Sequence, residues 1–292
     1  MIDGHVVLHD GRSVGYVDFG SEGQLPVLWC HGGPGSRFEP QGTAQEAGEA
    51  GFRLIGIDRP GYGTSTLQPG RSIAGWVGDG LAVADHLGLE RFLAVGVSTG
   101  GPYALALAAL APERVQAVIA CCALADMRWA EGKAMMRAAG TRDLWCAPDR
   151  PTAIAIAEEL LGGDGRKMFA TGLTSDALPA ADLAFLANPA FLVALQASFR
   201  AMFANGVQGY VDDRLADGPG WNGFELSSIR CPVMVLHGEE DTIVPVAHAH
   251  HTAATVPGAK LRVVSQLGHF SILREMVGAI REVAREAGAA GS

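Results

Sequence analysis

The sequence predicts an α/β protein in which helices cover both faces of a mostly parallel sheet. Short, continuously apolar runs such as Phe92–Val97 and Val115–Cys121 have the length and composition of fully buried strands. Segments with helical periodicity, such as Ile73–Leu87, alternate with these runs. Strands that alternate with helices along the chain are typical of parallel sheets, because each helix carries the chain back to the start of the next strand.

The first half of the chain supplies a hairpin followed by alternating strands and helices. Asp10-Gly11 separates two apolar-rich runs, which predicts an antiparallel hairpin at one edge of the sheet. The expected strands are His5–His9, Ser13–Phe19, Pro26–Cys30, Arg53–Ile57, Phe92–Val97 and Val115–Cys121. The expected helices are Gln41–Ala50, Ile73–Leu87 and Gly101–Ala111.

Residues 126–228 interrupt this pattern. Short helical segments rich in Ala, Met, Phe and Leu are broken there by proline and glycine, and no buried strand stands out. The sheet pattern then resumes with the expected elements Val233–His237, Val246–Thr255, Lys260–Val264 and Ile272–Ala287. We therefore expect a core domain formed by residues 1–125 and 229–292, with a mainly helical insertion at 126–228.

The composition excludes several classes of function. The chain has 292 residues, of which 48% are hydrophobic and 18% charged, as in globular proteins. Its net charge is -9 and it has no run of Lys or Arg, so we expect no nucleic-acid partner. The longest apolar stretches, Ala104–Ala111 and Ala117–Ala125, fall well short of the ~18 residues that a membrane span needs.

The N-terminus and the cysteines favour a cytoplasmic location. The first residues include Asp3 and no apolar run, which does not predict a signal peptide. The five cysteines are odd in number and form no Cys-x-x-Cys pair, so we expect no disulfide framework. They are Cys30, Cys121, Cys122, Cys146 and Cys231. The sequence does not specify the oligomeric state.

Ser98 is the expected nucleophile. The segment Gly96–Gly100 matches the pattern Gly-x-Ser-x-Gly, directly after an expected strand and before an expected helix. Such a turn exposes a strained serine, and its glycines avoid collisions with the neighbouring backbone. The N-terminus of the following helix favours developing negative charge. An ordinary N-capping serine is the alternative without a catalytic role.

A serine hydroxyl needs a base to activate it, and the usual chain order in such proteins is Ser, then Asp or Glu, then His. His269 follows the expected strand Lys260–Val264 and is the expected base. Asp241 follows Val233–His237 in the pattern Gly-x-x-Asp-x-x-Val-Pro, and is expected to accept the ring proton of the base. The alternative acids are Glu239, Glu240 and Asp126, and the other histidines considered are His5, His9, His86 and His237.

Two backbone N–H groups are expected to hold the oxyanion that acyl transfer generates. One belongs to Thr99, the residue after the nucleophile, and the other to the segment His31-Gly32-Gly33-Pro34-Gly35. Pro34 has no N–H, so Gly33 is the expected donor.

Neither a metal nor an organic cofactor is expected. The segment His248-Ala249-His250-His251 lacks a carboxylate that would complete a familiar ligand pattern, so we interpret it as a solvated helix face. The glycine-rich segment after Cys30 does not match a dinucleotide or phosphate-loop motif.

These motifs, in their order and spacing, resemble those of the α/β-hydrolase superfamily over nearly the whole chain. The resemblance rests on His31-Gly32-Gly33-Pro34-Gly35, Asp58-Arg59-Pro60-Gly61-Tyr62-Gly63-Thr64-Ser65, Gly96–Gly100, Asp241 and His269. It implies the α/β-hydrolase fold, with a mostly parallel eight-stranded sheet and helices on both faces. It also implies that residues 126–228 form a helical cap over the active site.

Individual motifs of the chain can be compared with those of particular subfamilies. The His-Gly-Gly-Pro-Gly segment is similar to that of proline iminopeptidases, whose elbow is usually Gly-Gly-Ser-Trp-Gly where this chain has Gly-Val-Ser-Thr-Gly. Epoxide hydrolases and haloalkane dehalogenases carry Asp at the elbow, so Ser98 argues against both. An aminopeptidase also needs a carboxylate for the substrate amine, for which Glu131, Glu158 and Glu159 are candidates.

We therefore predict a serine hydrolase that cleaves carboxylic esters of small to medium, largely apolar molecules. Apolar side chains of the insertion and the neighbour of His269 are expected to bind the substrate, although the insertion's own core also explains most of them. These residues are Trp129, Met136, Trp145, Phe199 and Phe270. The alternatives are an aminopeptidase or amidase similar to proline iminopeptidase, a perhydrolase or C–C bond hydrolase with the same triad, and a non-catalytic binding protein of this fold.

Overall fold

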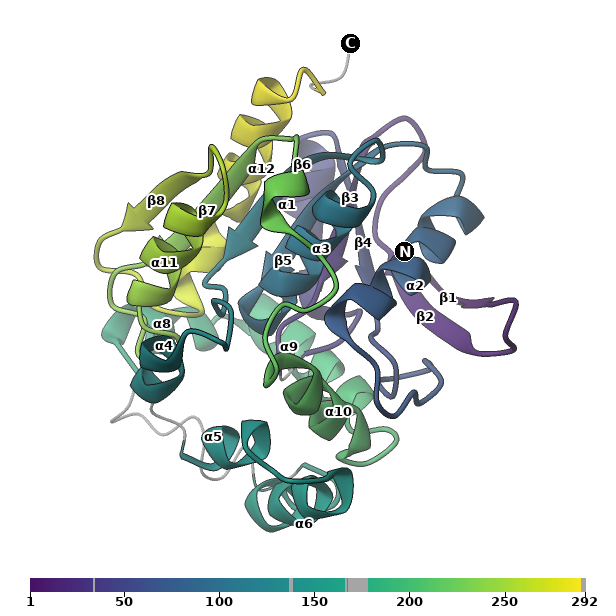
Figure 1. Ribbon diagram of the computed structural model, residues 1–292. Helices are drawn as coiled ribbons and strands as arrows, with labels where there is room; N and C mark the ends of the chain where they lie inside the picture. The colour runs from purple at the N-terminus through teal and green to yellow at the C-terminus, as the bar shows by residue number, and fades with distance from the viewer. Residues whose placement is uncertain (34, 137–138, 166, 168–177, 290–292) are drawn as a thin grey trace.

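The computed structural model describes residues 1–33, 35–136, 139–165, 167 and 178–289 (Figure 1). Its strands are β1 (Ile2–Val7), β2 (Ser13–Asp18), β3 (Leu25–Cys30), β4 (Phe52–Ile57), β5 (Phe92–Val97), β6 (Val115–Cys121), β7 (Val233–Gly238) and β8 (Lys260–Val264). They form one eight-stranded sheet in the order β1-β2-β4-β3-β5-β6-β7-β8. The β1–β2 and β2–β4 pairs are antiparallel and the remaining pairs are parallel, which confirms the predicted sheet.

Five described α-helices outside residues 126–228 follow strands of the sheet. They are α1 (Ala44–Glu49), α2 (Ile73–His86), α3 (Gly101–Leu110), α11 (Ala247–Thr255) and α12 (Met276–Glu286). Ser72 begins α2 because its hydroxyl accepts a hydrogen bond of 3.0 Å from the N–H of Gly75. The predicted helix Ile272–Ala287 instead begins as a 3₁₀ turn, η4 (Ser271–Glu275), before α12.

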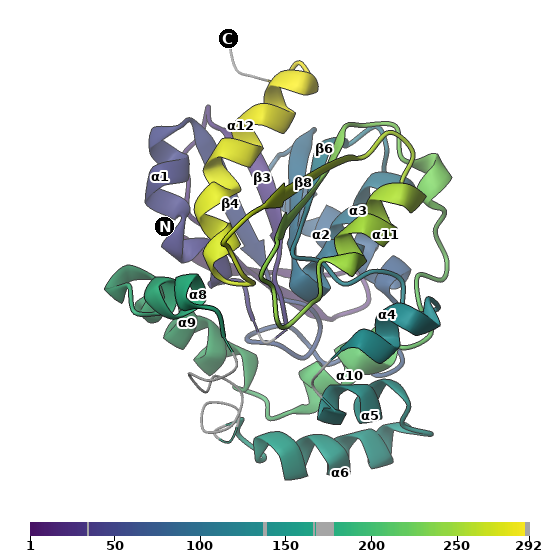
Figure 2. The same ribbon diagram turned by 90° about the vertical axis from the view of Figure 1, so that its left-hand side faces the viewer.

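The two faces of the sheet bury separate apolar clusters, because successive side chains of a strand point to opposite faces. Leu28 and Cys30 of β3 join the cluster that α2 and α3 cover. Val27 and Trp29 of the same strand join the cluster that α1 and α12 cover. Figure 2 shows α1 and α12 on one side of the sheet, and α2, α3 and α11 on the other.

The described part of residues 126–228, called here the helical segment, contains helices and no strand. These helices are α4 (Ala130–Met135), α5 (Ala139–Trp145), α6 (Arg150–Leu161), α8 (Ala180–Leu186), α9 (Pro189–Met202), α10 (Gln208–Asp217) and the 3₁₀ turn η3 (Leu226–Ser228). Helices α4 to α10 gather at one end of the sheet, opposite the C-terminus, whereas η3 packs against α3 (Figure 2). Among the described helices, none alone has the length and apolarity of a membrane span, whereas α8 and α9 meet those criteria only as a pair bent by 80°.

We predict that Gly100→Ala destabilises the fold by about 1–3 kcal/mol, in the range of overpacked cores. A Cβ atom on Gly100 would lie 2.0 Å from the carbonyl oxygen of Cys30, where backbone cannot move aside easily. Gly78→Ala is the matched control, because Gly78 is exposed in α2 and its added Cβ meets nothing within 4 Å. This control should stabilise the protein by about 0.5–1 kcal/mol. Urea unfolding of both variants tests the prediction, and equal effects would contradict it.

Candidate active site

Ser98 lies at a strained turn between β5 and α3. Its φ is 53°, in the left-handed region that few residues other than glycine adopt, and the side chain is buried. A Cβ on Gly96 would lie 2.3 Å from the carbonyl oxygen of Gly100, so these two glycines bring the backbone segments together. Strain of about 1–3 kcal/mol at such a residue persists only where the surrounding structure enforces it.

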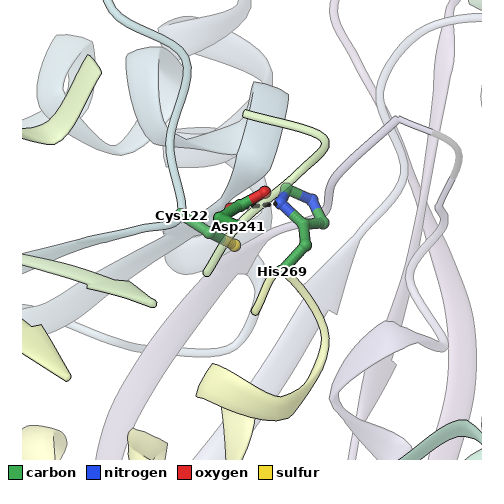
Figure 3. A group of neighbouring side chains, drawn as sticks. All are labelled: Cys122, Asp241 and His269. Atoms are coloured by element: carbon green, nitrogen blue, oxygen red, sulfur yellow. Dashed lines mark hydrogen bonds and ion pairs between the residues drawn. The ribbon is translucent and has the colours of Figure 1, made fainter. Parts of the chain in front are cut away.

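Asp241 and His269 form a buried hydrogen-bonded pair (Figure 3). Nδ1 of His269 lies 2.7 Å from Oδ2 of Asp241, and Oδ1 of Asp241 accepts the N–H groups of Ile243 and Val244 at 2.9 and 2.8 Å. Burial opposes the ionised form of Asp241, but His269 and His237 outweigh it and lower the pKa of this carboxyl. The carboxylate therefore favours the tautomer in which Nδ1 of His269 carries the proton and Nε2 is free to act as a base.

The alternative acids and bases occupy other positions. Glu239 and Glu240 are exposed, and Asp126 accepts hydrogen bonds from Arg128, which lowers the pKa of Asp126 against the effect of burial. His237, considered above as a base, is fully buried beside the acid, with Nε2 at 3.2 Å from Oδ2 of Asp241. It thus supports Asp241, a role that no sequence pattern indicated.

Cys122 adjoins the pair and was not predicted as a site residue. Its sulfur, an oxygen of Asp241 and a ring nitrogen of His269 all lie within 4.8 Å of one another (Figure 3). Cys122 follows β6 with a φ of 41° and is fully buried. Burial raises the pKa of the Cys122 thiol well above its ordinary value. A protonated thiol is a poor metal ligand, so the trio is better explained as packing around the imidazole.

The loop that carries His269 is held by Asp182 of α8 in the helical segment. One oxygen of this carboxylate accepts the N–H of His269 at 2.9 Å. The other accepts the N–H of Ser271 at 2.8 Å, its hydroxyl at 2.6 Å and the N–H of Phe270 at 3.2 Å. Asp182 is fully buried, so four donors of one loop converge on a single acceptor group. No local pattern in the sequence indicates this contact, because it joins residues 87 positions apart.

His31 shapes the loop of the predicted oxyanion donor. Burial, reinforced by the charge of Arg59, lowers the pKa of His31 well below its ordinary value, so the ring is neutral. Nδ1 of His31 lies 2.7 Å from the carbonyl oxygen of Gly32, and Nε2 lies 3.3 Å from the N–H of Arg59. These distances fit a ring that donates from Nδ1 and accepts at Nε2.

The two predicted oxyanion donors are neighbours in space. A Cβ on Gly33 would lie 2.9 Å from the hydroxyl oxygen of Thr99. A Cβ on Gly32 would lie 3.3 Å from Cβ of Ser98, which places the loop directly beside Ser98. Pro34, used above in the choice of Gly33, lies outside the described residues.

Arg59 and Asp213 bind the loop to the helical segment. The Arg59 guanidinium donates to the carbonyl oxygens of His31 at 2.5 Å and Gly32 at 3.1 Å. Its Nε and Nη2 atoms also donate to Asp213 of α10, at 2.9 and 2.6 Å. Both side chains are fully buried, and Asp213 further accepts hydrogen bonds from Tyr62 and Arg71.

Glu39 is a second carboxyl group beside this loop that sequence reasoning missed. Its oxygens accept the indole N–H of Trp29 at 2.6 Å and the N–H of Gly32 at 2.9 Å. Burial raises the pKa of Glu39 to about 7, although both hydrogen bonds act against this rise. Glu131, Glu158 and Glu159, the acids considered for an amine, are exposed.

The five predicted substrate-binding residues have different surroundings. Met136 and Trp145 are buried in a cluster with Leu124 and Val244. The backbone N–H of Leu124 donates to the carbonyl oxygen of Ser98, and that of Val244 donates to Oδ1 of Asp241. Phe270 packs edge-on against the ring of His269, with ring centroids 5.5 Å apart.

The other two predicted binding residues lie elsewhere. Trp129 stacks on His251 of α11, with centroids 4.1 Å apart, and Phe199 is buried in α9. A hollow of about 520 Å³, lined by residues 63–67 with Asn205 and Gln208, includes none of the predicted site residues.

The interpretation of His248 as part of a solvated face is wrong. His248 is fully buried, and its ring nitrogens lie 3.1 Å from the N–H of Ala125 and 3.1 Å from the carbonyl oxygen of Gly132. The ring therefore links α11 to Ala125 and Gly132, which lie before and after Trp129 in the chain. Both ring nitrogens already have hydrogen-bond partners.

Residues 26–275 match the alpha/beta hydrolase fold family. The chain belongs to this α/β hydrolase family. It is 32% identical to the 2-hydroxymuconate semialdehyde hydrolase of Pseudomonas putida over 85% of this chain and 81% of that protein. It is 27% identical to the non-heme haloperoxidase of Rhodococcus erythropolis, over 90% and 92% of the two chains. The structure of an alpha/beta hydrolase fold protein from Nakamurella multipartita covers all of both chains, with 26% identity and a TM-score of 0.69.

We predict that Asp182→Ala costs this α/β hydrolase about 2–4 kcal/mol of stability, because buried donors of the His269 loop lose their acceptor. The catalytic rate should also fall, since the base loses its fixed position. Asp143→Ala is the control, because Asp143 is an exposed acid of α5 in the same helical segment and should change stability by less than ~0.5 kcal/mol. Urea denaturation measures both; an Asp182→Ala variant as stable as the control would disprove the role.

Proposed function

We propose that this α/β hydrolase cleaves carboxylic esters of small to medium, largely apolar substrates through an acyl-enzyme on Ser98. The observation that carries the proposal is the buried Asp241–His269 hydrogen bond, which follows strands β7 and β8 of the same sheet whose strand β5 ends at the strained Ser98 turn. A serine, an imidazole and a carboxylate in this relation are the groups that acyl transfer requires.

The proposed reaction has two steps. Ser98 Oγ attacks the ester carbonyl carbon while Nε2 of His269 takes the hydroxyl proton, and the N–H groups of Gly33 and Thr99 stabilise the oxyanion. His269 then gives this proton to the leaving alcohol, which departs and leaves the acyl group on Ser98. Water, deprotonated by His269, attacks the acyl-enzyme and releases the acid with the serine restored.

A C–C bond hydrolase with the same triad is the second candidate. The relative from Pseudomonas putida supports it, because the name of its substrate, 2-hydroxymuconate semialdehyde, contains no ester or amide. The aminopeptidase alternative has less support, since the three acids considered for the amine are exposed and both oxygens of Glu39 already accept hydrogen bonds.

We predict that wild type hydrolyses p-nitrophenyl esters, tested from acetate to decanoate, and that Ser98→Ala loses turnover by roughly 10⁴-fold or more, as expected when a covalent nucleophile is removed. The acyl chain length that is hydrolysed fastest would then indicate the size of the acyl-binding pocket. Pro-p-nitroanilide serves as the peptidase substrate in the same experiment. Cleavage of the anilide with no ester turnover would favour an aminopeptidase. Failure of Ser98 to react with a fluorophosphonate probe would count against the nucleophile.

The pH dependence of kcat/KM should report His269. Burial disfavours its charged form, but Asp241 outweighs burial and raises the pKa of His269 well above its ordinary value. Since the base must be neutral, ester hydrolysis should rise with pH along a limb that lies above pH ~6.5.

Two variants test which group titrates along this limb of the pH profile. In Asp241→Asn the raising charge is lost, so the limb should move to lower pH while the rate falls by roughly 10⁴-fold. In Glu39→Gln the limb should stay in place, because His269 sets it. Glu39 is tested because burial raises the pKa of this carboxyl to about 7. A limb that disappears in Glu39→Gln would assign the profile to Glu39 instead.

A further inference from the structure

Arg214 of α10 carries a buried donor edge that the proposed reaction does not use. The side chain is 2% exposed, and its Nε and Nη2 atoms have no hydrogen-bond partner among the described residues. These two nitrogens form one side of the guanidinium plane, the side that a carboxylate occupies when it binds with both oxygens.

Other arginines of this chain show what such an edge usually holds. Arg59, Arg53 and Arg150 each direct Nε and Nη2 to the carboxylate of an aspartate, at 2.6–3.1 Å in the closest contacts. Arg214 differs because its nearest carboxylate, Asp217, lies 3.0 Å from Nη2 as an ion pair without hydrogen-bond geometry. Both oxygens of Asp217 are themselves without a hydrogen-bond partner.

The buried ion cluster around Arg214 has more guanidinium groups than carboxylates. It contains three guanidinium groups and two carboxylates, namely Arg59, Arg71, Arg214, Asp213 and Asp217. Asp213 already accepts hydrogen bonds from Arg59, Arg71 and Tyr62, and among the described residues it accepts none from Nε or Nη2 of Arg214. An incompletely paired buried cation is costly, so its presence calls for an anionic partner.

The donor edge of Arg214 that lacks hydrogen bonds lies at the candidate active site. Nη2 of Arg214 is 3.0 Å from the point where a Cβ on Gly33 would sit, and the hydroxyl oxygen of Thr99 is 2.9 Å from the same point. These are the two residues proposed to hold the oxyanion. The rings of Tyr210 and Trp145, whose centroids lie 5.0 and 6.0 Å from Cζ of Arg214, flank the guanidinium.

We propose that Arg214 binds a carboxylate carried by the acyl part of the substrate, so that the preferred ester is a half-ester of a dicarboxylic acid. The acyl part is chosen because the leaving alcohol must face His269, whereas Arg214 lies beside Gly33 and Thr99. The proposal rests on ester hydrolysis as the reaction and refines the otherwise apolar substrate to one with a single anionic group.

The test compares charged and neutral esters of the same shape. Monomethyl succinate and monomethyl glutarate are paired with methyl 4-methylpentanoate and methyl 5-methylhexanoate, in which an isopropyl group replaces the carboxylate. The kcat/KM ratio of charged to neutral ester is measured for wild type, Arg214→Met and Arg214→Lys. We expect the ratio to fall roughly 10- to 100-fold in Arg214→Met, mainly through KM, as for the loss of a charged hydrogen-bond pair. Arg214→Lys should keep part of the preference.

Arg150→Met is the matched control, because Arg150 makes its two-nitrogen pair with Asp212 on the same helix α10. It should leave the ratio unchanged. An unchanged ratio in Arg214→Met would overturn the proposal. If kcat also falls equally for both esters, Arg214 would instead act on the oxyanion. If Arg214→Met does not fold, Arg214→Gln replaces it with a neutral polar side chain.

A binding measurement separates this proposal from the proposed function. Glutarate should raise the unfolding temperature of wild type and of Ser98→Ala, and should not raise that of Arg214→Met. If no ester is cleaved but this difference is seen, the carboxylate site stands and ester hydrolysis fails. If esters are cleaved with no charge preference and glutarate has no effect, ester hydrolysis stands and the carboxylate site fails.

Discussion

The buried ion pair between Arg59 and Asp213 is the contact on which the candidate site depends. Arg59 follows β4 in the core and Asp213 belongs to α10 of the helical segment. The same guanidinium donates to the carbonyl oxygens of His31 and Gly32, so one side chain fixes both the helix and the loop beside Ser98. Two charges remain stable out of water only when their hydrogen bonds are satisfied, so loop and helix must be correctly placed together.

The proposed base is held in a similar way from both parts of the chain. Asp241, after β7 of the core, fixes the His269 ring, whereas Asp182, on α8 of the helical segment, fixes its backbone. The helical segment therefore helps to position the proposed base. Movement of α8 would alter the base, and movement of α10 would alter the Gly32–Gly33 backbone and Arg214.

Those features of the fold that depend on local chemistry could be predicted from the sequence. Continuous apolar runs such as Phe92–Val97 gave the strands, because a strand buried on both faces has no polar positions. Boundaries were less predictable. The first strand is Ile2–Val7 and not His5–His9, because Leu8 donates to the carbonyl oxygen of Arg12 within the hairpin turn.

The sequence by itself determined the strand-turn-helix at Ser98, the order of Ser98, Asp241 and His269, and the helical character of the described part of residues 126–228. Each of these follows from short-range patterns of glycine, apolar residues and loop motifs. Only the tertiary structure decided that Asp182 holds the His269 loop, that His248 is buried, and that Arg214 lies beside Gly33 with two nitrogens that lack hydrogen bonds among the described residues. The reason is physical: burial and pairing of a charged or polar side chain depend on groups distant in sequence, and a lone Asp, His or Arg in a helix looks the same whether it faces water or a site.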